Sequence, residues 1–254
     1  YGKVTGKAKY AEDFKVDGML HTRLLTSPIP HARIARIDVS KALQMDGVAA
    51  VLTADDVPFI PNLGNPILTN EPAYVGDPIL AIAAEDERTA EDAIQAINFD
   101  FEPLPFVVDP LTSLRPNGPH ARTQGNVGNA TMQDDFRSVH WSDDEMAALV
   151  NKELPQGEPA REWSVGDLEA GFASAAYTID ESFVTASYSH NSMEPRSALA
   201  YWENGKCFLY GSSQSQSFPV PALAEYIGID PANLVFVAEY CGGGFGSKEL
   251  HIRP

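Results

Sequence analysis

Cysteine is scarce in this chain: 254 residues contain two, Cys207 and Cys241. Their spacing fits none of the zinc or dithiol motifs. An iron–sulfur cluster normally needs more thiolate ligands than these two cysteines supply, so the chain cannot hold one by itself. We therefore expect both cysteines to be small apolar residues rather than metal ligands.

Positive charge is also sparse. Lysine and arginine together number 18 against 35 acidic residues, which gives a net charge of −17. Nucleic-acid binding needs a basic surface, so this function class is excluded. The hydrophobic share of 44% and charged share of 21% are those of an ordinary globular protein. The length is sufficient for a sizeable core in one or two domains.

Long apolar runs are absent from the sequence. No stretch approaches the length of a membrane span, and no signal peptide opens the chain. The sequence begins at Tyr1 without an initiator methionine, which is consistent with the removal of earlier residues. We expect a cytoplasmic protein, with the periplasm as the alternative.

The pattern of residues 1–115 predicts a compact α/β domain. Asp86 is a candidate N-cap for a helix over residues 87–97, in which apolar residues recur on one face. Ser40 is the candidate N-cap of a shorter helix that extends to Met45. The strand, helix and strand over residues 77–102 indicate a βαβ-like or split α/β unit. The strands are predicted over residues 19–26, 33–39, 48–53, 77–84 and 98–102.

Residues 116–166 form a polar connector that is rich in proline and acidic residues. A capping box from Ser142 to Glu145 predicts one helix within it. The connector is long for a compact domain. We interpret it as a linker across the surface, with an arm that grips a neighbouring subunit as the alternative.

A second domain is predicted from residue 167 to the end. Asp167 is placed to cap a helix that ends at Ala175, and alternation over residues 177–185 predicts a strand. Asn204 and Gly205 separate two further strands and fit a two-residue hairpin turn. A helix over residues 221–227, stopped by Gly228, then leads into a buried apolar strand over residues 234–238.

A glycine-rich loop follows this last strand, from Cys241 to Glu249. Its glycines permit positive φ and close approach of the backbone, and its exposed N–H groups suit an anion or an oxo group. The nucleoside-triphosphate motif is excluded, because Ser247 and Glu249 stand where it needs glycine and then serine or threonine. The dinucleotide motif is excluded, because Ser247 stands where its last glycine is needed. The alternative is an ordinary tight turn or bulge.

The sequence of this loop resembles the molybdopterin-contacting loop in the large subunit of the xanthine dehydrogenase/aldehyde oxidase family. Other stretches resemble the family in the expected order: residues 2–10, 27–34 and 76–78 its hammerhead domain, residues 189–195 its loop ending in Glu-Pro, and residues 213–215 its Gln-containing segment. The resemblance implies an α+β fold. A hammerhead-like α/β domain (residues 1–115) and the connector (116–166) would precede the first part of a molybdopterin-binding domain (167–254).

The resemblance also implies a reaction. Family members hydroxylate an N-heterocycle or an aldehyde with oxygen derived from water, and they pass the electrons to iron–sulfur and flavin centres. The implied cofactor is molybdenum bound to molybdopterin or to its cytosine dinucleotide form. The implied partners are the remainder of the large subunit, a 2Fe-2S small subunit, and an FAD-binding medium subunit or another electron acceptor.

Carried over position by position, the resemblance implies a set of cofactor-binding residues. The backbone N–H of Phe245 would face an oxo ligand, and no residue of the chain is expected to bind the metal directly. The cofactor-binding set is Gly243, Gly244, Phe245, Gly246 and Gln214.

Two further positions are implied to line the substrate pocket. Glu249 matches a position that points into the pocket in purine-oxidising members, and its alternative is a carboxylate that faces solvent or pairs with Lys248. Tyr188 stands where those members carry glutamine, which argues against xanthine as the substrate.

The family's catalytic base is a glutamate that the resemblance places beyond Pro254. We therefore expect a fragment or one piece of a split large subunit, without a catalytic residue of its own and inactive alone. One alternative is a relative specific for aldehydes or carbon monoxide. Another is a cofactor-free assembly or binding module that keeps the fold without catalysis.

Overall fold

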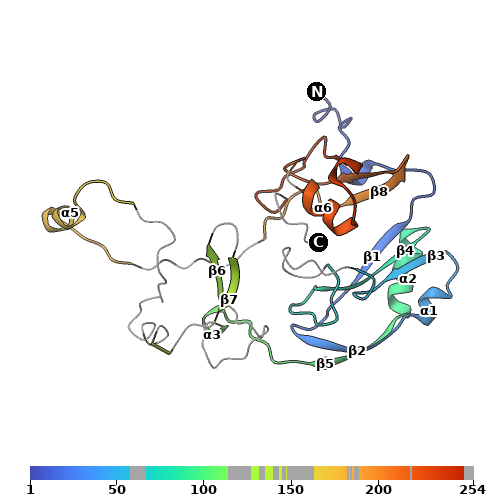
Figure 1. Cartoon of the computed structure of the whole chain (residues 1–254), viewed down its shortest axis with the longest axis horizontal. Coiled ribbons are helices and arrows are strands. Elements are labelled where there is room, and N and C mark those ends of the chain that lie inside the picture. The colour runs from blue at the N-terminus through green and yellow to red at the C-terminus, as the bar shows by residue number, and fades with distance from the viewer. Residues whose placement is uncertain are drawn as a thin grey trace. The chain divides into compact units, whose positions relative to one another are not determined.

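The computed structural model describes residues 1–57, 67–113, 127–131, 135–139, 143–144, 147, 163–181, 183, 185, 189–217 and 219–248. The chain divides into two compact units (Figure 1). The first combines Tyr1–Leu104 with Ser189–Pro254, and the second is Pro105–Tyr188.

The N-terminal part of the first unit contains two antiparallel sheets. Strand β4 (Pro78–Ala84) is the centre of one sheet, between β1 (His21–Thr26) and β3 (Val48–Leu52). Strands β2 (Ala32–Asp38) and β5 (Asn98–Pro103) form the other. Helix α2 (Glu87–Ala96) packs against the first sheet, beside the short α1 (Ser40–Leu43) (Figure 1). Their shared core is centred on Ile79, Leu80 and Ile82.

The predicted cap of α2 is confirmed, because Asp86 accepts a hydrogen bond from the Thr89 N–H at 2.8 Å. The predicted cap of α1 is wrong. Ser40 lies inside the helix, and the N-cap position is Val39. The Asp38 carboxylate accepts a hydrogen bond from the Ser40 N–H at 3.0 Å instead. An aspartate two residues before an N–H group can accept from it through its side chain, so Asp38 caps the N-terminal end of this helix.

The unit formed by β4, α2 and β5 is split, and it is not a parallel βαβ unit. β4 pairs with β1 and β3, whereas β5 pairs with β2 in the other sheet. The strand periodicity cannot distinguish these arrangements, because it does not specify which strands are neighbours.

The C-terminal part of the first unit is a three-stranded sheet. Strand β9 (Lys206–Gly211) is central, antiparallel to β8 (Ala198–Glu203) and parallel to β10 (Leu234–Val237). Positive φ at Asn204 (51°) and Gly205 (76°) confirms the predicted hairpin turn. Helix α6 (Val220–Ile227) ends at Gly228 as predicted, and the turn η3 (Pro231–Asn233) leads into β10. β10 is less buried than predicted, since only its first residue is fully buried.

The N-terminal segment packs on this sheet through aromatic contacts. The Tyr10 ring lies 5.9 Å from that of Tyr240, and the Phe14 ring lies 4.6 Å from that of Tyr210. The Lys3 ammonium lies 5.4 Å from the centre of the Tyr240 ring. A short turn, η1 (Ala11–Asp13), separates Tyr10 from Phe14. These contacts restrain Tyr240, which stands immediately before Cys241 and the glycine loop.

The second unit contains a strand pair within the stretch predicted as a connector. β6 (Val127–Thr131) and β7 (Asp135–Val139) are antiparallel, and a short helix, α3 (Pro110–Ser113), precedes them. Helix α5 (Leu168–Ser174) has the predicted cap, with Asp167 accepting from the Ala170 N–H at 3.0 Å. The predicted capping box falls on Ser142 and Glu145, which lie outside the described residues.

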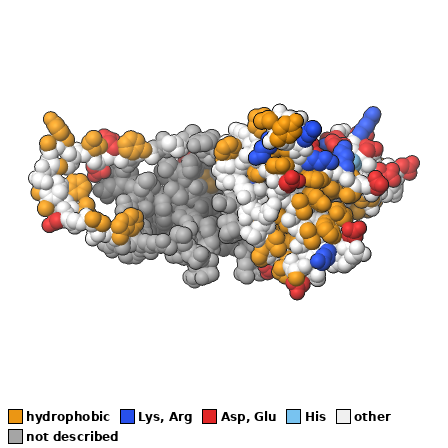
Figure 2. Space-filling model, turned by 90° about the horizontal axis from the view of Figure 1, so that it is seen from above, with side chains coloured by type: hydrophobic (Ala, Val, Ile, Leu, Met, Phe, Trp, Pro, Cys, Tyr) orange, Lys and Arg blue, Asp and Glu red, His pale blue; other side chains and the backbone are white. Residues whose placement is uncertain are grey.

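The strand predicted over residues 177–185 is not present at 177–181, 183 and 185, the positions described there. Tyr177, Ile179 and Phe183 expose most of their side chains. Figure 2 shows exposed apolar side chains in the segment around α5, at the left of the view. A strand is stable only when it pairs with another strand, so the alternation of apolar and polar residues was not enough to predict one here. Among the described residues, no helix is long and apolar enough to cross a membrane.

Candidate functional site

Three loops meet at one edge of the sheet β8–β9–β10. Because β9 and β10 are parallel, the loops that follow them start at the same edge, at residues 212 and 238. β8 is antiparallel to β9, so the segment that leads into β8, residues 189–197, lies at this edge as well. The topology therefore brings together the three stretches on which the family resemblance of this domain was based.

Backbone conformation gives the glycine loop a tight shape. Gly243 and Gly246 have φ values of 100° and 95°, and Phe245 has a φ of 52°. The Ser247 N–H and hydroxyl both donate to the Gly244 carbonyl, at 2.9 Å and 2.7 Å. The Phe245 ring is 73% exposed. This turn points its aromatic side chain outward and keeps Gly244 buried.

A buried ion pair between Glu194 and Lys248 connects the two ends of the loop. The Lys248 Nζ lies 3.0 Å from Glu194 Oε2 and donates to the Glu194 carbonyl at 2.7 Å. The same Oε2 accepts from the Gly242 N–H at 2.7 Å, and the Glu194 N–H donates to the Gly242 carbonyl at 3.2 Å. Both charged residues are less than one-tenth exposed. One carboxylate oxygen therefore joins the first and last parts of the loop.

Gln214 fastens the other side of the loop. Its Oε1 accepts from the Gly246 N–H at 3.0 Å and from the Lys248 N–H at 3.4 Å. The backbone N–H of Gln214 donates to the Lys248 carbonyl at 2.9 Å. Arg196 adds a contact, with Nη2 donating to the Ser247 carbonyl. The side-chain oxygen Oε1 of Gln214 is thus bonded to the loop, so that any contact between the Gln214 side chain and a cofactor would use Nε2.

Three consecutive amides at the centre of the loop form no hydrogen bond within the described residues, and we call them the open amides in this sense, since Gly244 itself is buried. The N–H groups of Gly243, Gly244 and Phe245 make no hydrogen bond to any of the described residues. Ser192 lies against this stretch, because a Cβ added to Gly243 would sit 3.6 Å from the Ser192 Cβ. Its hydroxyl is buried without a partner in the described part of the chain. Such a set of donors suits an anionic or oxo-bearing group.

The structure brings the five predicted cofactor residues together, from Gln214 and the loop positions 243–246. The two predicted substrate residues, Tyr188 and Glu249, lie outside the described residues. Sequence reasoning missed the pairing of Glu194 with Lys248, although both residues stood in motifs that it had singled out. Among the described residues there is no cluster of His, Cys, Asp and Glu that could hold a metal ion.

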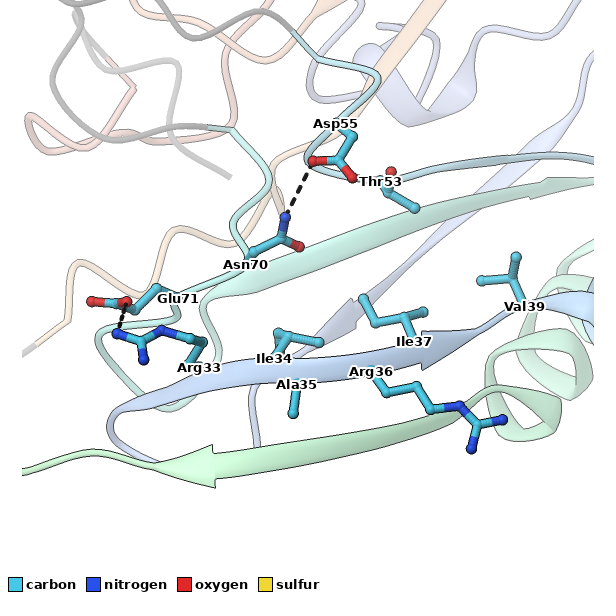
Figure 3. Close-up of a pocket in the computed structure, with 10 residues that line it drawn as sticks. All are labelled: Arg33, Ile34, Ala35, Arg36, Ile37, Val39, Thr53, Asp55, Asn70 and Glu71. Atoms are coloured by element: carbon cyan, nitrogen blue, oxygen red, sulfur yellow. Dashed lines mark hydrogen bonds and ion pairs between the residues drawn. The ribbon is translucent and has the colours of Figure 1, made fainter.

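A separate groove of about 470 Å³ lies on the N-terminal part of the first unit, along β2 (Figure 3). Two pairs of its polar side chains contact each other: Arg33 pairs with Glu71 at 3.2 Å, and Asn70 with Asp55 at 3.3 Å. Arg36 and Thr53, which also line it, pair with Asp38 and Asp56 outside the lining. None of the loop residues described above lines it. We assign no function to this groove.

Comparison with known proteins identifies the family. The family model described as "aldehyde oxidase and xanthine dehydrogenase, a/b hammerhead domain" matches residues 5–105, and the molybdopterin cofactor-binding domain matches residues 150–254. The chain belongs to the xanthine dehydrogenase and aldehyde oxidase family. The predicted α+β fold, with a hammerhead domain before a molybdopterin-binding domain, is confirmed. The family consists of molybdopterin-dependent oxidoreductases, and this chain is part of a molybdenum-binding large subunit.

Several family members illustrate the match. A probable xanthine dehydrogenase subunit of Bacillus subtilis is 31% identical over 100% of this chain and 31% of its own length. The nicotine 6-hydroxylase large subunit of Paenarthrobacter nicotinovorans is 28% identical over 99% of the chain and 29% of its own length. The crystal structure of a Cu,Mo-CO dehydrogenase gives a TM-score of 0.72 at 26% identity, covering 98% of this chain and 31% of the other. The chain thus spans about three-tenths of the length of these relatives.

Electrostatics of the buried pair predict a dependence of stability on pH. Burial raises the pKa of Glu194, but hydrogen bonds from Gly242 and Lys248, together with the Lys248 charge, outweigh it and hold the pKa below the ordinary 4.5. The Glu194 Oε1 and the Ser212 hydroxyl make no hydrogen bond of normal geometry within the described residues. We therefore ascribe the lowered pKa mainly to Gly242 and Lys248.

A carboxylate whose pKa is lowered on folding adds stability above its unfolded pKa, and this contribution is lost as the pH falls through the folded value. Glu194→Gln is therefore expected to lower the unfolding temperature at pH 7, and the deficit should shrink below pH ~4.5. Thermal unfolding of both proteins between pH 7 and 3 measures this. Glu87→Gln, which breaks an exposed pair with Arg23 (2.8 Å), is the control and should change little. A deficit that stays constant at all pH values would contradict the prediction.

Proposed function

We propose that this chain supplies a cofactor-holding loop of a molybdenum hydroxylase, which oxidatively hydroxylates an N-heterocycle or an aldehyde. The observation that carries the proposal is the row of three open amides at Gly243, Gly244 and Phe245, held in place by Glu194, Gln214 and Lys248. A row of N–H donors can bind a group that carries anionic or oxo oxygens. An ordinary turn does not require such a row, because its unbonded N–H groups can face water.

The role of this chain is to bind and to orient the cofactor. A molybdenum–pterin group, when bound, would supply the redox chemistry by which oxygen from water enters the substrate and a pair of electrons leaves. The amides of Gly243, Gly244 and Phe245 would donate to its oxygens, with the Phe245 N–H facing an oxo group. The Gln214 Nε2 is a further donor on the same side. The loop is compatible with both forms of the cofactor, molybdopterin and its cytosine dinucleotide.

Substrate class and partners follow from the same proposal. Glu249 would face the substrate, and Tyr188 would stand near the reacting centre, where it disfavours xanthine. The electrons would pass to a 2Fe-2S subunit and then to an FAD-binding subunit or another acceptor. The remainder of the large subunit would supply the glutamate base. We place the assembly in the cytoplasm, with the periplasm as the alternative.

Elemental and pterin analysis of the purified native assembly tests this proposal. We expect about one molybdenum and one pterin for each copy of this chain, as one loop serves one cofactor. An assembly that contains neither would refute the proposal and favour a cofactor-free assembly module. A panel of N-heterocycles, aldehydes and carbon monoxide with an artificial electron acceptor would then assign the substrate class.

A further inference from the structure

The Glu194–Lys248 pair occupies an unusual place for two buried charges. Glu194 Oε2 receives the Gly242 N–H at 2.7 Å and the Lys248 ammonium at 3.0 Å, so one atom bonds to both ends of the loop. The side chains of the pair are 6% and 2% exposed. The open amides of residues 243–245 lie between these two anchored ends.

Stability alone does not account for this arrangement. Burying two charges costs desolvation energy that their attraction often fails to recover, and well-packed apolar residues would serve as well or better. A buried pair is informative where it fixes one geometry among several. Here the fixed geometry is that of the glycine loop, whose residues have wide conformational freedom and little side-chain packing of their own.

Electrostatics point the same way. Lys248 is neutralised by Glu194, so the pair adds no net charge beneath the loop. Besides the Arg196 guanidinium, which donates to the Ser247 carbonyl, the attraction of the loop for an anionic group therefore depends on its amide dipoles, which attract most strongly when several N–H groups converge. Loss of convergence would weaken binding even if the overall fold survived.

From these observations we infer that Glu194 and Lys248 are positioning residues, which hold the amides of residues 243–245 in the arrangement that receives the cofactor. The inference rests on the proposed function for the identity of the ligand. The order that the pair imposes on the loop is independent of the ligand.

The decisive variant is the double substitution Glu194→Gln and Lys248→Met in the complete assembly. It removes both charges together and keeps the side-chain volumes similar, so that no buried charge is left unpaired and the unfolding temperature should stay near that of the wild type. The bond from residue 248 to residue 194 is nevertheless lost. Molybdenum and pterin content should fall about 10-fold, the lower range found when supporting groups around a metal site are removed.

Hydrogen exchange provides a readout that does not need the cofactor. In the cofactor-depleted assembly, the peptide over residues 241–248 should exchange faster in the double variant, whereas the β9 peptide over residues 206–211 should be unchanged. Arg23→Met, which breaks the exposed Arg23–Glu87 pair, is the matched control and should leave both peptides and the cofactor content as in the wild type.

Each outcome is decisive. Wild-type exchange of peptide 241–248 together with full cofactor content in the double variant would overturn the inference. Failure of the double variant to fold would assign the pair to overall stability and would overturn it as well. A wild-type assembly without molybdenum and pterin would refute the proposed function instead, and faster exchange in the double variant would still support the positioning role.

Discussion

Replacing Gly244 with valine is expected to lower the molybdenum and pterin content of the assembled protein by roughly 10- to 100-fold. A Cβ at this position would lie 2.6 Å from the Gln214 Cγ and closer still to its amide carbon and Oε1. Gln214 would have to leave, and the Gly246 N–H would lose its acceptor. Metal analysis by mass spectrometry and fluorescence of the oxidised pterin measure the loss.

Gly244→Val can lower the cofactor content for either of two reasons, and a second variant separates them. The added side chain could displace Gln214, or it could block the approach of the cofactor to the backbone. Gln214→Ala combined with Gly244→Ala removes the first obstacle, since the truncated residue 214 leaves room for the new Cβ. Gln214→Ala alone is the matched control.

The double variant is expected to hold as little cofactor as Gly244→Ala alone, because the backbone at residue 244 remains covered. Recovery to the level of Gln214→Ala would show that the glycine serves only the packing of Gln214. A normal molybdenum content in Gly244→Val would contradict the assignment of the loop altogether.

Local features of the fold were predictable from the sequence because their causes lie within a few residues. The Asp86 carboxylate reaches a neighbouring N–H group, and the Asn204–Gly205 turn needs two positive φ values that these residue types tolerate. The α1 cap shows the limit of such rules. Asp38 and Ser40 both carry side chains that can cap a helix, and the sequence does not reveal which of them accepts a hydrogen bond at its start.

Long-range features were not predictable in the same way. Residues 177–185 alternate as a strand does, but alternation does not provide a partner, and those of them that the structure describes stay irregular. Glu194 and Lys248 are 54 residues apart, and nothing in either motif indicates that the two side chains meet. Only the pairing of β8, β9 and β10 brings their loops to one edge.

The glycine loop itself was understood only in part. Its glycines were predicted to leave the backbone bare for a ligand, and the open amides of residues 243–245 are compatible with this idea. The structure adds a second cause, because Gly242 and Gly244 lie directly against Glu194 and Gln214. A sequence shows where side chains are missing, but it does not show whether a ligand or the protein fills the space.

Gly242 is the position where this second cause predicts the largest loss of stability. A Cβ on residue 242 would lie 2.5 Å from the Glu194 Cβ and 3.5 Å from its Cα. Neither atom can swing away as the end of a flexible side chain could, and Glu194 is further held by Lys248 and by the Gly242 N–H. Gly242→Ala is therefore expected to cost about 1–3 kcal/mol of unfolding free energy, the usual range for overpacking.

Urea unfolding of the wild type and of Gly242→Ala measures this cost. Gly171→Ala in α5 is the matched control, because a Cβ there meets nothing within 4 Å. Alanine is the better helix former, so the control should be neutral or slightly more stable. Equal stability of Gly242→Ala and the wild type would mean that the Glu194 backbone yields to the new methyl group, and that the contact between these two loops is not rigid. A loss confined to Gly242→Ala would show that the loop is held by close contact with residue 194 before any cofactor arrives.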